Sequence, residues 1–463
     1  MARGLRRAFL MLALLAVTAQ ARAESPASAA EPRAQRGEAE RSLEDAAEPR
    51  AQQGAAERSL EDEVRARDDR IDDLERKVDV LVDELSHLRT QVAVPEEAEL
   101  VSAYGLGPAA SKIYGVERGL SLGGYGEANY TNAVDGGGTD RADFLRLVTY
   151  LGYKFSESII FNAEIEYEHA TTGSTATSGS GEVSVEFAAL DFFWKEALNA
   201  RTGLVLLPMG FINEVHEPPF FFGVQRPETE RRIIPSTWRE NGAGIFGRLR
   251  EDLEYRAYVV TGFNAAGFSS SGIRGGRQQG NRAVAEDLAF VGRLDWTPAE
   301  AWLLGGSLYA GDSGQTGLPD ARLVMWDLHA QYRSGPWQAR ALFAMNRLSD
   351  AGDLSRALGL APGSPVAEQM LGGYGELAYD VWPLLTGSEA KYLAPFVRVE
   401  YVDPQNQVPS GFSRDGNKRF WLGTVGLSYK PHPNVVLKLE YRQFAPDEGD
   451  IPNEIGLGMG FAF

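Results

Sequence analysis

The stretch Ile159-Ile160-Phe161-Asn162-Ala163-Glu164-Ile165-Glu166-Tyr167 has an apolar side chain at every second position and polar or acidic side chains at most positions between. Alternation with a period of two predicts a β-strand with one apolar and one polar face. Strands of an outer-membrane barrel, which face lipid outside and water inside, have this pattern. A soluble sandwich gives similar alternation, so the stretch alone leaves both folds open.

The spacing between repeats of this pattern distinguishes the two folds. The connections run in turn long and short: 131–141 is long, 155–157 short, 208–240 very long and 250–252 short. Up-and-down strands with long loops at one end and short turns at the other are typical of bacterial outer-membrane barrels. We therefore predict an all-β transmembrane antiparallel β-barrel of about sixteen strands over residues 120–463, with strands at 120–130, 142–154, 158–169, 182–194, 198–207, 241–249, 253–262, 286–296, 301–311, 322–333, 336–346, 369–380, 391–402, 419–429, 434–444 and 455–463.

The ends of this barrel predict its orientation. An even number of strands places both ends at the short-turn side, which faces the periplasm in such barrels. The last strand alternates apolar with small residues and ends at Phe463, which resembles the assembly signal of outer-membrane barrels. Localisation in the outer membrane of a Gram-negative-type bacterium, in contact with its lipid, follows from the fold.

The interior of the barrel is predicted to hold water, because barrels of about sixteen strands are too wide for side chains to fill. The inferred inward positions are polar, as a water-filled channel requires. Each of them alone is readily explained as a solvated residue without a special role. The lumen candidates are Arg146, Arg256, Arg293, Arg333, Arg340, Arg398, Lys438 and Arg442.

The residues before the barrel fall into four segments. Residues 1–23 resemble an export signal, with Arg3, Arg6 and Arg7 before an apolar core and a small-residue cleavage site at 21–23. A polar tandem repeat follows at 24–63 and is interpreted as an exposed spacer. Heptads with apolar residues at two positions predict a periplasmic coiled coil over 64–94, and 95–119 is interpreted as a linker. A lone amphipathic helix is the alternative for 64–94.

Composition excludes several classes of function. A formal charge of −18 argues against nucleic acid as a partner. The chain has no cysteine, so neither a disulfide nor a lipid on cysteine is available. Its five histidines have no Gly-x-Ser-x-Gly motif and no metal-ligand spacing near them, so we expect no enzyme, no metal and no cofactor.

The long connection 208–240 is the strongest candidate for a functional element, since long loops in compact domains are commonly functional. It concentrates arginines and glutamates, and rings of fixed charge set ion selectivity in a channel. Pairing of these charges with one another, to hold the loop against the wall, is the alternative explanation. The pore constriction candidates are Arg226, Arg231, Arg232, Arg239, Glu214 and Glu217.

This loop and its flanks also carry a resemblance to a known family. Residues 203–210 (GLVLLPMG), 220–222 (FFF), 230–236 (ERRIIPS) and 238–242 (WRENG) resemble the corresponding segment of the phosphate-selective porin O/P family. The resemblance implies a trimeric sixteen-stranded porin whose third loop folds inward, with diffusive uptake of small and often anionic solutes. This barrel departs from the phosphate-selective members, which have a lysine- and arginine-rich lumen, because it has few lysines and places glutamates among the arginines.

The sequence therefore leaves three hypotheses. The first is a porin for small hydrophilic solutes or ions, anions among them, acting as a homotrimer and narrowed by 208–240. The second is a structural protein whose periplasmic coiled coil tethers the envelope through a periplasmic or cell-wall partner. The third, with the weakest support, is an outer-membrane lipid hydrolase.

Overall fold

The computed structural model describes residues 65, 67, 70–82, 92–93, 100–134, 138–174 and 179–463. Residues 79–463 form a compact unit of their own. The predicted export signal at 1–23 and the spacer at 24–63 lie outside the described residues. Across the described part of the chain, none of the helices is long and apolar enough to span a membrane.

Part of the predicted coiled coil is helical. Residues 70–82 form a helix, and the heptad residues Ile71, Leu74, Val78 and Leu81 are each more than half exposed in the single chain. Self-association of this helix stays a prediction. The last heptad position differs from the prediction, because Val92–Ala93 (β1) pairs in parallel with Leu120 and Ser121 instead of continuing a helix.

Of the seventeen described strands, the sixteen predicted ones form the barrel, and each is antiparallel to the next around the barrel. Their bounds follow the sequence alternation closely, with differences of a few residues at the ends. They are β2 (Gly119–Ala133), β3 (Arg141–Ser156), β4 (Ile159–Glu168), β5 (Val183–Lys195), β6 (Leu198–Leu206), β7 (Arg239–Arg250), β8 (Leu253–Thr261), β9 (Leu288–Ala299), β10 (Trp302–Asp312), β11 (Arg322–Ser334), β12 (Trp337–Leu348), β13 (Gln369–Tyr379), β14 (Tyr392–Gln407), β15 (Phe420–His432), β16 (Val435–Pro446) and β17 (Glu454–Ala462).

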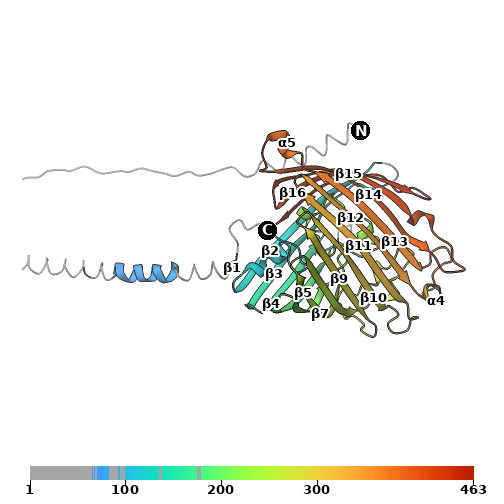
Figure 1. The fold of residues 1–463 in the computed structure, drawn as a ribbon, viewed down its shortest axis with the longest axis horizontal. Coiled ribbons are helices and arrows are strands. Elements are labelled where there is room, and N and C mark those ends of the chain that lie inside the picture. Colours follow the sequence, from blue (N-terminus) through green and yellow to red (C-terminus); the bar gives the residue numbers. More distant parts are fainter. Residues whose placement is uncertain are drawn as a thin grey trace, which may run out of the picture. The chain divides into compact units, whose positions relative to one another are not determined.

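The sheet closes on itself where the last strand meets the first. β17 pairs with β2 from Glu454 opposite Ala133 to Ala462 opposite Tyr125. Phe463 extends this seam, since its N–H donates to the carbonyl of Gly124 at 2.9 Å and its carbonyl accepts from the N–H of Gly124 at 3.0 Å. Figure 1 shows the C-terminus beside β2. Closure leaves no strand edge in lipid, where unpaired backbone groups are costly.

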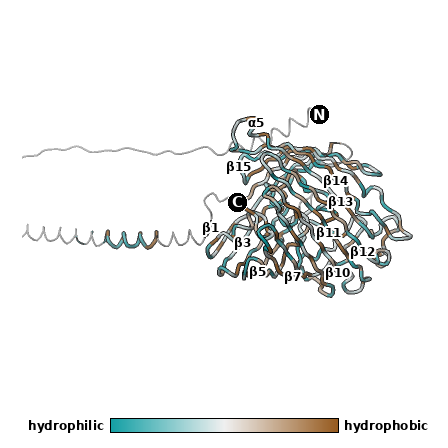
Figure 2. The backbone as a smooth tube through the Cα atoms, in the orientation of Figure 1, coloured by the Kyte–Doolittle hydropathy of each residue, from teal (hydrophilic) through white to brown (hydrophobic). Residues whose placement is uncertain are grey.

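The two faces of the wall differ as the alternation predicts. On β14, Val397 and Val399 are 50% and 56% exposed, whereas Arg398 and Glu400 between them are buried. On β4, Glu164 and Glu166 are likewise buried. Figure 2 shows the resulting mixture of hydrophobic and hydrophilic positions along the strands. The apolar face therefore lies outward, toward lipid, and the polar face lines the interior.

The connections alternate in length as predicted. Figure 1 shows α4 (Ala351–Ala357) and α5 (Trp382–Thr386) at opposite ends of the barrel, on the β12–β13 and β13–β14 connections. The β13–β14 connection, which is long for a tight turn, is explained by α5. Short 3₁₀ turns lie in other connections: η2 (Pro218–Phe220), η3 (Ala265–Gly267), η4 (Arg274–Gly276) and η5 (Gly416–Lys418).

Candidate functional site

The long connection between β6 and β7 crosses the interior and bonds to the inner face of distant strands. Its backbone N–H groups donate to wall carboxylates: Gly210 to Asp327 at 3.2 Å, Val224 to Glu440 at 2.9 Å and Thr229 to Glu400 at 3.3 Å. Its carbonyls accept from wall side chains, including Arg340 at Phe220 and Asn346 at Ile233, both at 2.8 Å. Wall side chains therefore supply partners that irregular backbone needs when it is buried.

The base of this loop is held by its own side chains. Asn213 donates to the carbonyls of Leu207 and Trp238 at 2.7 and 2.9 Å and accepts from the N–H of Trp238 at 2.7 Å. Trp238 is buried against Phe263 and Tyr309, with ring centroids 4.6 and 5.0 Å away. These contacts fix the path of the loop, and they make Trp238 a packing residue of the interior.

The four arginines of the predicted constriction have different surroundings. Arg231 and Arg232, on the short helix α3 (Thr229–Arg232), both pair with Glu228 at 2.8 Å. Arg239 pairs with Glu186 of β5 at 2.5 Å. These three pairs fit the alternative that loop charges hold the loop in place.

Arg226 differs from the other three. It is buried at 8% exposure, and its Nη2 has no hydrogen-bond partner among the described residues. Burial, with the nearby Arg146, lowers the pKa of Arg226. The group stays protonated, because the ordinary pKa of arginine is far above neutral. Arg226 is therefore a buried cation without an ion-pair partner in the described part of the chain.

The two acidic constriction candidates also differ. Glu214 lies 3.2 Å from Arg256 and 3.5 Å from Arg293, so it joins the loop to β8 and β9. Glu217 instead accepts hydrogen bonds from the N–H of Ala109, at 2.9 and 3.1 Å to its two oxygens. Burial raises the pKa of Glu217 to about 8 although these bonds oppose the rise. Glu217 is therefore mostly protonated at neutral pH.

Histidine 216, between these acids in the chain, is buried beside Glu164 at 3.3 Å. Burial, with Arg226 and Arg146, lowers the pKa of His216 to about 3, so its ring is neutral. Within the residues described, no three His, Asp or Glu side chains gather in a way that could hold a metal ion.

The lumen candidates all come from strands that line the interior, and most are ion-paired. Their principal partners are Glu166 for Arg146, Asp295 for both Arg256 and Arg293, Glu400 for Arg398, and Glu228 with Glu454 for Arg442. Arg340 bonds to Gln331 and to the loop carbonyl of Phe220, and Lys438 lies over the ring of Phe221. Arg333 is exposed at the short-turn end. The fold thus brings loop and wall charges into one network.

Sequence reasoning missed a second segment inside the barrel. Residues 103–116, interpreted as linker, contain η1 (Ala110–Gly115) and bury Leu106, Ala109 and Ile113 against the wall. Asn162 of β4 donates to the carbonyl of Ala110 at 2.8 Å. A Cβ on Gly107 would strike the carboxyl group of Glu217, so glycine permits this close approach. The run of small and apolar residues after residue 105 was the available signal.

Glycines on the inner face of β17 carry no side chain, so the loop packs directly against the backbone of this strand. A Cβ on Gly458 would lie 3.2 Å from Val224, and one on Gly460 would collide with Pro218. At Gly375 of β13, by contrast, a Cβ would meet open space.

We therefore expect Gly460→Val to displace η2 from the wall, at a cost of about 1–3 kcal/mol as is usual for overpacking. The matched control, Gly375→Val, should leave the loop in place. Hydrogen exchange of the amides of residues 220–224 measures the difference. Equal protection in the two variants would contradict the packing described for η2.

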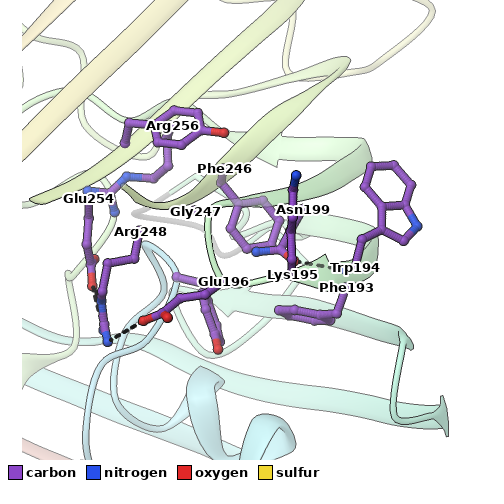
Figure 3. A pocket seen from close by; sticks show the side chains of 12 residues that line it. Phe193, Trp194, Lys195, Glu196, Asn199, Phe246, Gly247, Arg248, Glu254 and Arg256 are labelled. Carbon is purple, nitrogen blue, oxygen red and sulfur yellow. Dashed lines mark hydrogen bonds and ion pairs between the residues drawn. The ribbon is translucent and has the colours of Figure 1, made fainter. Parts of the chain in front are cut away.

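Two pockets open near the short-turn end of the barrel. The β5–β8 pocket, of about 370 Å³, is lined by Phe193, Phe246 and charged residues of the two adjacent turns. Figure 3 shows Arg248 there between Glu254 and Glu196, at 2.8 and 3.5 Å. A second pocket, of about 330 Å³, lies between Phe220–Phe222 of the loop and the wall from β11 to β16. We call it the Phe220 pocket.

Comparison with known proteins agrees with this architecture. Residues 248–457 match the family model described as "Putative beta-barrel porin-2, OmpL-like". An "Uncharacterized protein" of Aquifex aeolicus (strain VF5) is 37% identical over 363 residues, covering 76% of this chain and 82% of that protein. The solved structure "Salmonella typhi OmpF complex with Daunomycin" is similar with a TM-score of 0.53 and 13% identity, covering 75% of this chain and 98% of that one. At this identity the likeness shows the fold alone.

The closed sixteen-stranded barrel, its polar interior and the porin family match define an outer-membrane β-barrel porin. The chain belongs to the same family as the Aquifex aeolicus protein. The predicted fold class and the outer-membrane location are confirmed at this level.

Proposed function

We propose that the protein lets small hydrophilic solutes diffuse across the outer membrane, with a preference for anions, through a passage that the loop 208–240 narrows. The observation that carries the proposal is Arg226, a buried loop cation without an ion pair among the described residues. Fixed charge at a narrow point acts on permeating ions at close range, where little water screens it.

The acidic residues of the interior do not cancel this preference for anions, because many of them already accept hydrogen bonds or form ion pairs within the protein. Glu217 and Glu230 accept hydrogen bonds from backbone N–H groups, as Glu440 does from Val224 and Gln225. Other carboxylates pair with arginines of the wall. The cations Arg226, Lys430 and Lys438 form no ion pair within the described residues. The resemblance of the loop to the phosphate-selective porin O/P family also favours anions.

Planar bilayer recordings in a salt gradient test the proposal. Stepwise conductance with a reversal potential of the sign for anions is expected from the native protein. Arg226→Glu should move the reversal potential toward cation preference, whereas Arg356→Ala, which removes an exposed arginine of α4, should leave it unchanged. Absence of stepwise conductance would reject the channel, and cation preference of the native protein would reject the anion assignment.

We further propose a homotrimer with the segment 64–94 as a coiled coil on the periplasmic side. The heptad pattern supports association, since a helix with a half-exposed apolar seam is stabilised by burying that seam against other helices. Deletion of 30–94 should dissociate the trimer in mild detergent, as measured by native gels or light scattering. Trimers that survive the deletion would contradict this role and favour a periplasmic or cell-wall partner for the coil.

A further inference from the structure

We propose that the Phe220 pocket is a binding site for a small aromatic carboxylate at the short-turn end of the barrel. This inference deepens the proposed anion passage and rests on it for its physiological meaning. The cavity volume of about 330 Å³ corresponds to about ten water molecules. The pocket can therefore hold an organic anion rather than only a single inorganic ion.

The first element of the site is a set of cations that lie against aromatic rings. The Nζ of Lys438 is 3.6 Å from the centroid of Phe221, and that of Lys430 is 5.6 Å from Phe220 and 5.3 Å from Tyr392. Neither lysine forms an ion pair within the described chain, and Lys438 is only 5% exposed. These amines therefore lack the carboxylate that most buried cations have.

The second element is a pair of hydroxyl groups without partners. The side chains of Tyr392 and Ser428 both line the pocket, and neither oxygen has a hydrogen-bond partner in the described structure. Ser428 lies directly opposite Lys438 in the β15–β16 register, so their side chains project from the same face of the sheet. The two hydroxyl donors share the pocket lining with the ammonium group of Lys430, so a carboxylate bound there could accept hydrogen bonds from them.

The third element is the apolar side of the pocket. Phe220, Phe221 and Phe222 come from the loop, and Phe222 is stacked on Phe396 of β14 at a centroid distance of 5.7 Å. Aromatic faces favour edge or offset contact with another ring. A ligand with a carboxylate at one end and a ring at the other fits both sides, whereas inorganic phosphate would contact only the cations and the hydroxyl groups.

Four cations line the pocket, Arg333, Arg340, Lys391 and Lys430, against two acids, Asp380 and Glu389, so the lining has a net positive charge. Asp380 lines it, but its Oδ1 accepts from the N–H groups of Trp382 and Leu393 at 3.0 and 3.1 Å, which fix the β13–β14 turn. The β5–β8 pocket provides the contrast, because its Arg248 is shared by two glutamates. The two pockets are similar in size, at about 370 and 330 Å³.

Titration calorimetry of the full-length protein in detergent tests the site, with benzoate and inorganic phosphate as the probes. Saturable benzoate binding is expected, with much weaker phosphate binding. The double change Lys430→Met with Lys438→Met should lower benzoate affinity about tenfold or more, as loss of charge-assisted hydrogen bonds does. Lys438→Arg should retain binding. Lys418→Met, which removes a partly exposed lysine of η5, is the matched control.

Each outcome is decisive. Equal benzoate affinity in the native protein and the double variant, or no saturable binding to the native protein, would overturn the proposed site. Phosphate binding as tight as benzoate binding would overturn the aromatic ligand class. Anion-selective conductance without benzoate binding would support the proposed channel and reject the site. Benzoate binding without conductance would support the site and reject the channel.

Discussion

Replacing Glu228 with alanine is expected to release the central part of the loop 208–240 from the barrel wall. Glu228 is buried and accepts from Arg231 and Arg232 at 2.8 Å and from Arg442 of β16 at 2.6 Å. Burial alone would raise the pKa of Glu228, but Arg231, Arg442 and Arg232 outweigh it and hold that pKa well below its ordinary value. One carboxylate therefore neutralises several cations at the junction of loop and wall.

The expected cost of Glu228→Ala is about 3 kcal/mol, the lower end of the range for removing one partner of a buried ion pair. It falls at the lower end because Arg231 and Arg232 are 45% and 38% exposed and can be hydrated, and Arg442 keeps Glu454 at 2.7 Å. Hydrogen exchange of the amides of 226–236 should accelerate, and anion preference in bilayers should increase.

The control for this change is an ion pair at the surface. Asp353→Ala breaks the pair with Arg356, whose two side chains are 65% and 61% exposed, and should cost at most about 1 kcal/mol. Exchange in 226–236 that is as slow in Glu228→Ala as in the native protein would contradict the role of Glu228.

The second large effect is a dependence of the inner segment 103–116 on pH. Burial raises the pKa of Glu217 from its ordinary value of 4.5 to about 8 when its carboxyl group lies against Ala109 and Ala110. Between pH 4.5 and about pH 8, Glu217 keeps its proton when the segment 103–116 is packed against it and loses that proton when the segment is detached. The packed state is therefore most stable below about pH 4.5 and loses stability as the pH rises to about 8. Above about pH 8 its stability no longer changes with pH.

The loss over this interval is about 5 kcal/mol, from about 1.4 kcal/mol for each unit of pKa. Hydrogen exchange of the amides of 106–113, corrected for intrinsic rates, should show weaker protection at pH 8.5 than at pH 5.5. Glu217→Gln keeps an oxygen that can accept from Ala109 and should abolish the dependence. The same pH dependence in Glu217→Gln would show that another group is responsible.

The wall of the barrel could be predicted from the sequence because its signal is local. Each strand alternates by itself, as in 159–167, and each short turn is adjacent to the strands it joins. The assignment of inward polar residues followed from the same alternation, so Arg398 and Arg442 could be placed in the interior without knowledge of their partners. Strand ends shifted by a few residues where β14 and β15 continue beyond their apolar runs.

The positions of the loop 208–240 and of the segment 103–116 inside the barrel could not be predicted in this way. They depend on contacts between residues far apart in the chain. Nothing local distinguishes Arg226, which lacks an ion pair in the described structure, from Arg231, which has Glu228. The segment 103–116 has few charges and no periodicity, and its burial depends on Glu217 and Asn162, which are supplied by distant elements. The position of Phe220 and Phe221 beside Lys430 and Lys438 likewise depends on contacts between residues far apart in the chain.

The packing of the loop against the glycines of β17 has a consequence for the order of assembly. Pro218 and Val224 rest on Gly460 and Gly458, which belong to the last strand of the chain. The loop lies far from that strand in the chain, so these contacts form only when the last strand has taken its place beside β2. The final strand therefore completes two things at once: the closed wall of the barrel and the glycine surface against which Pro218 and Val224 pack.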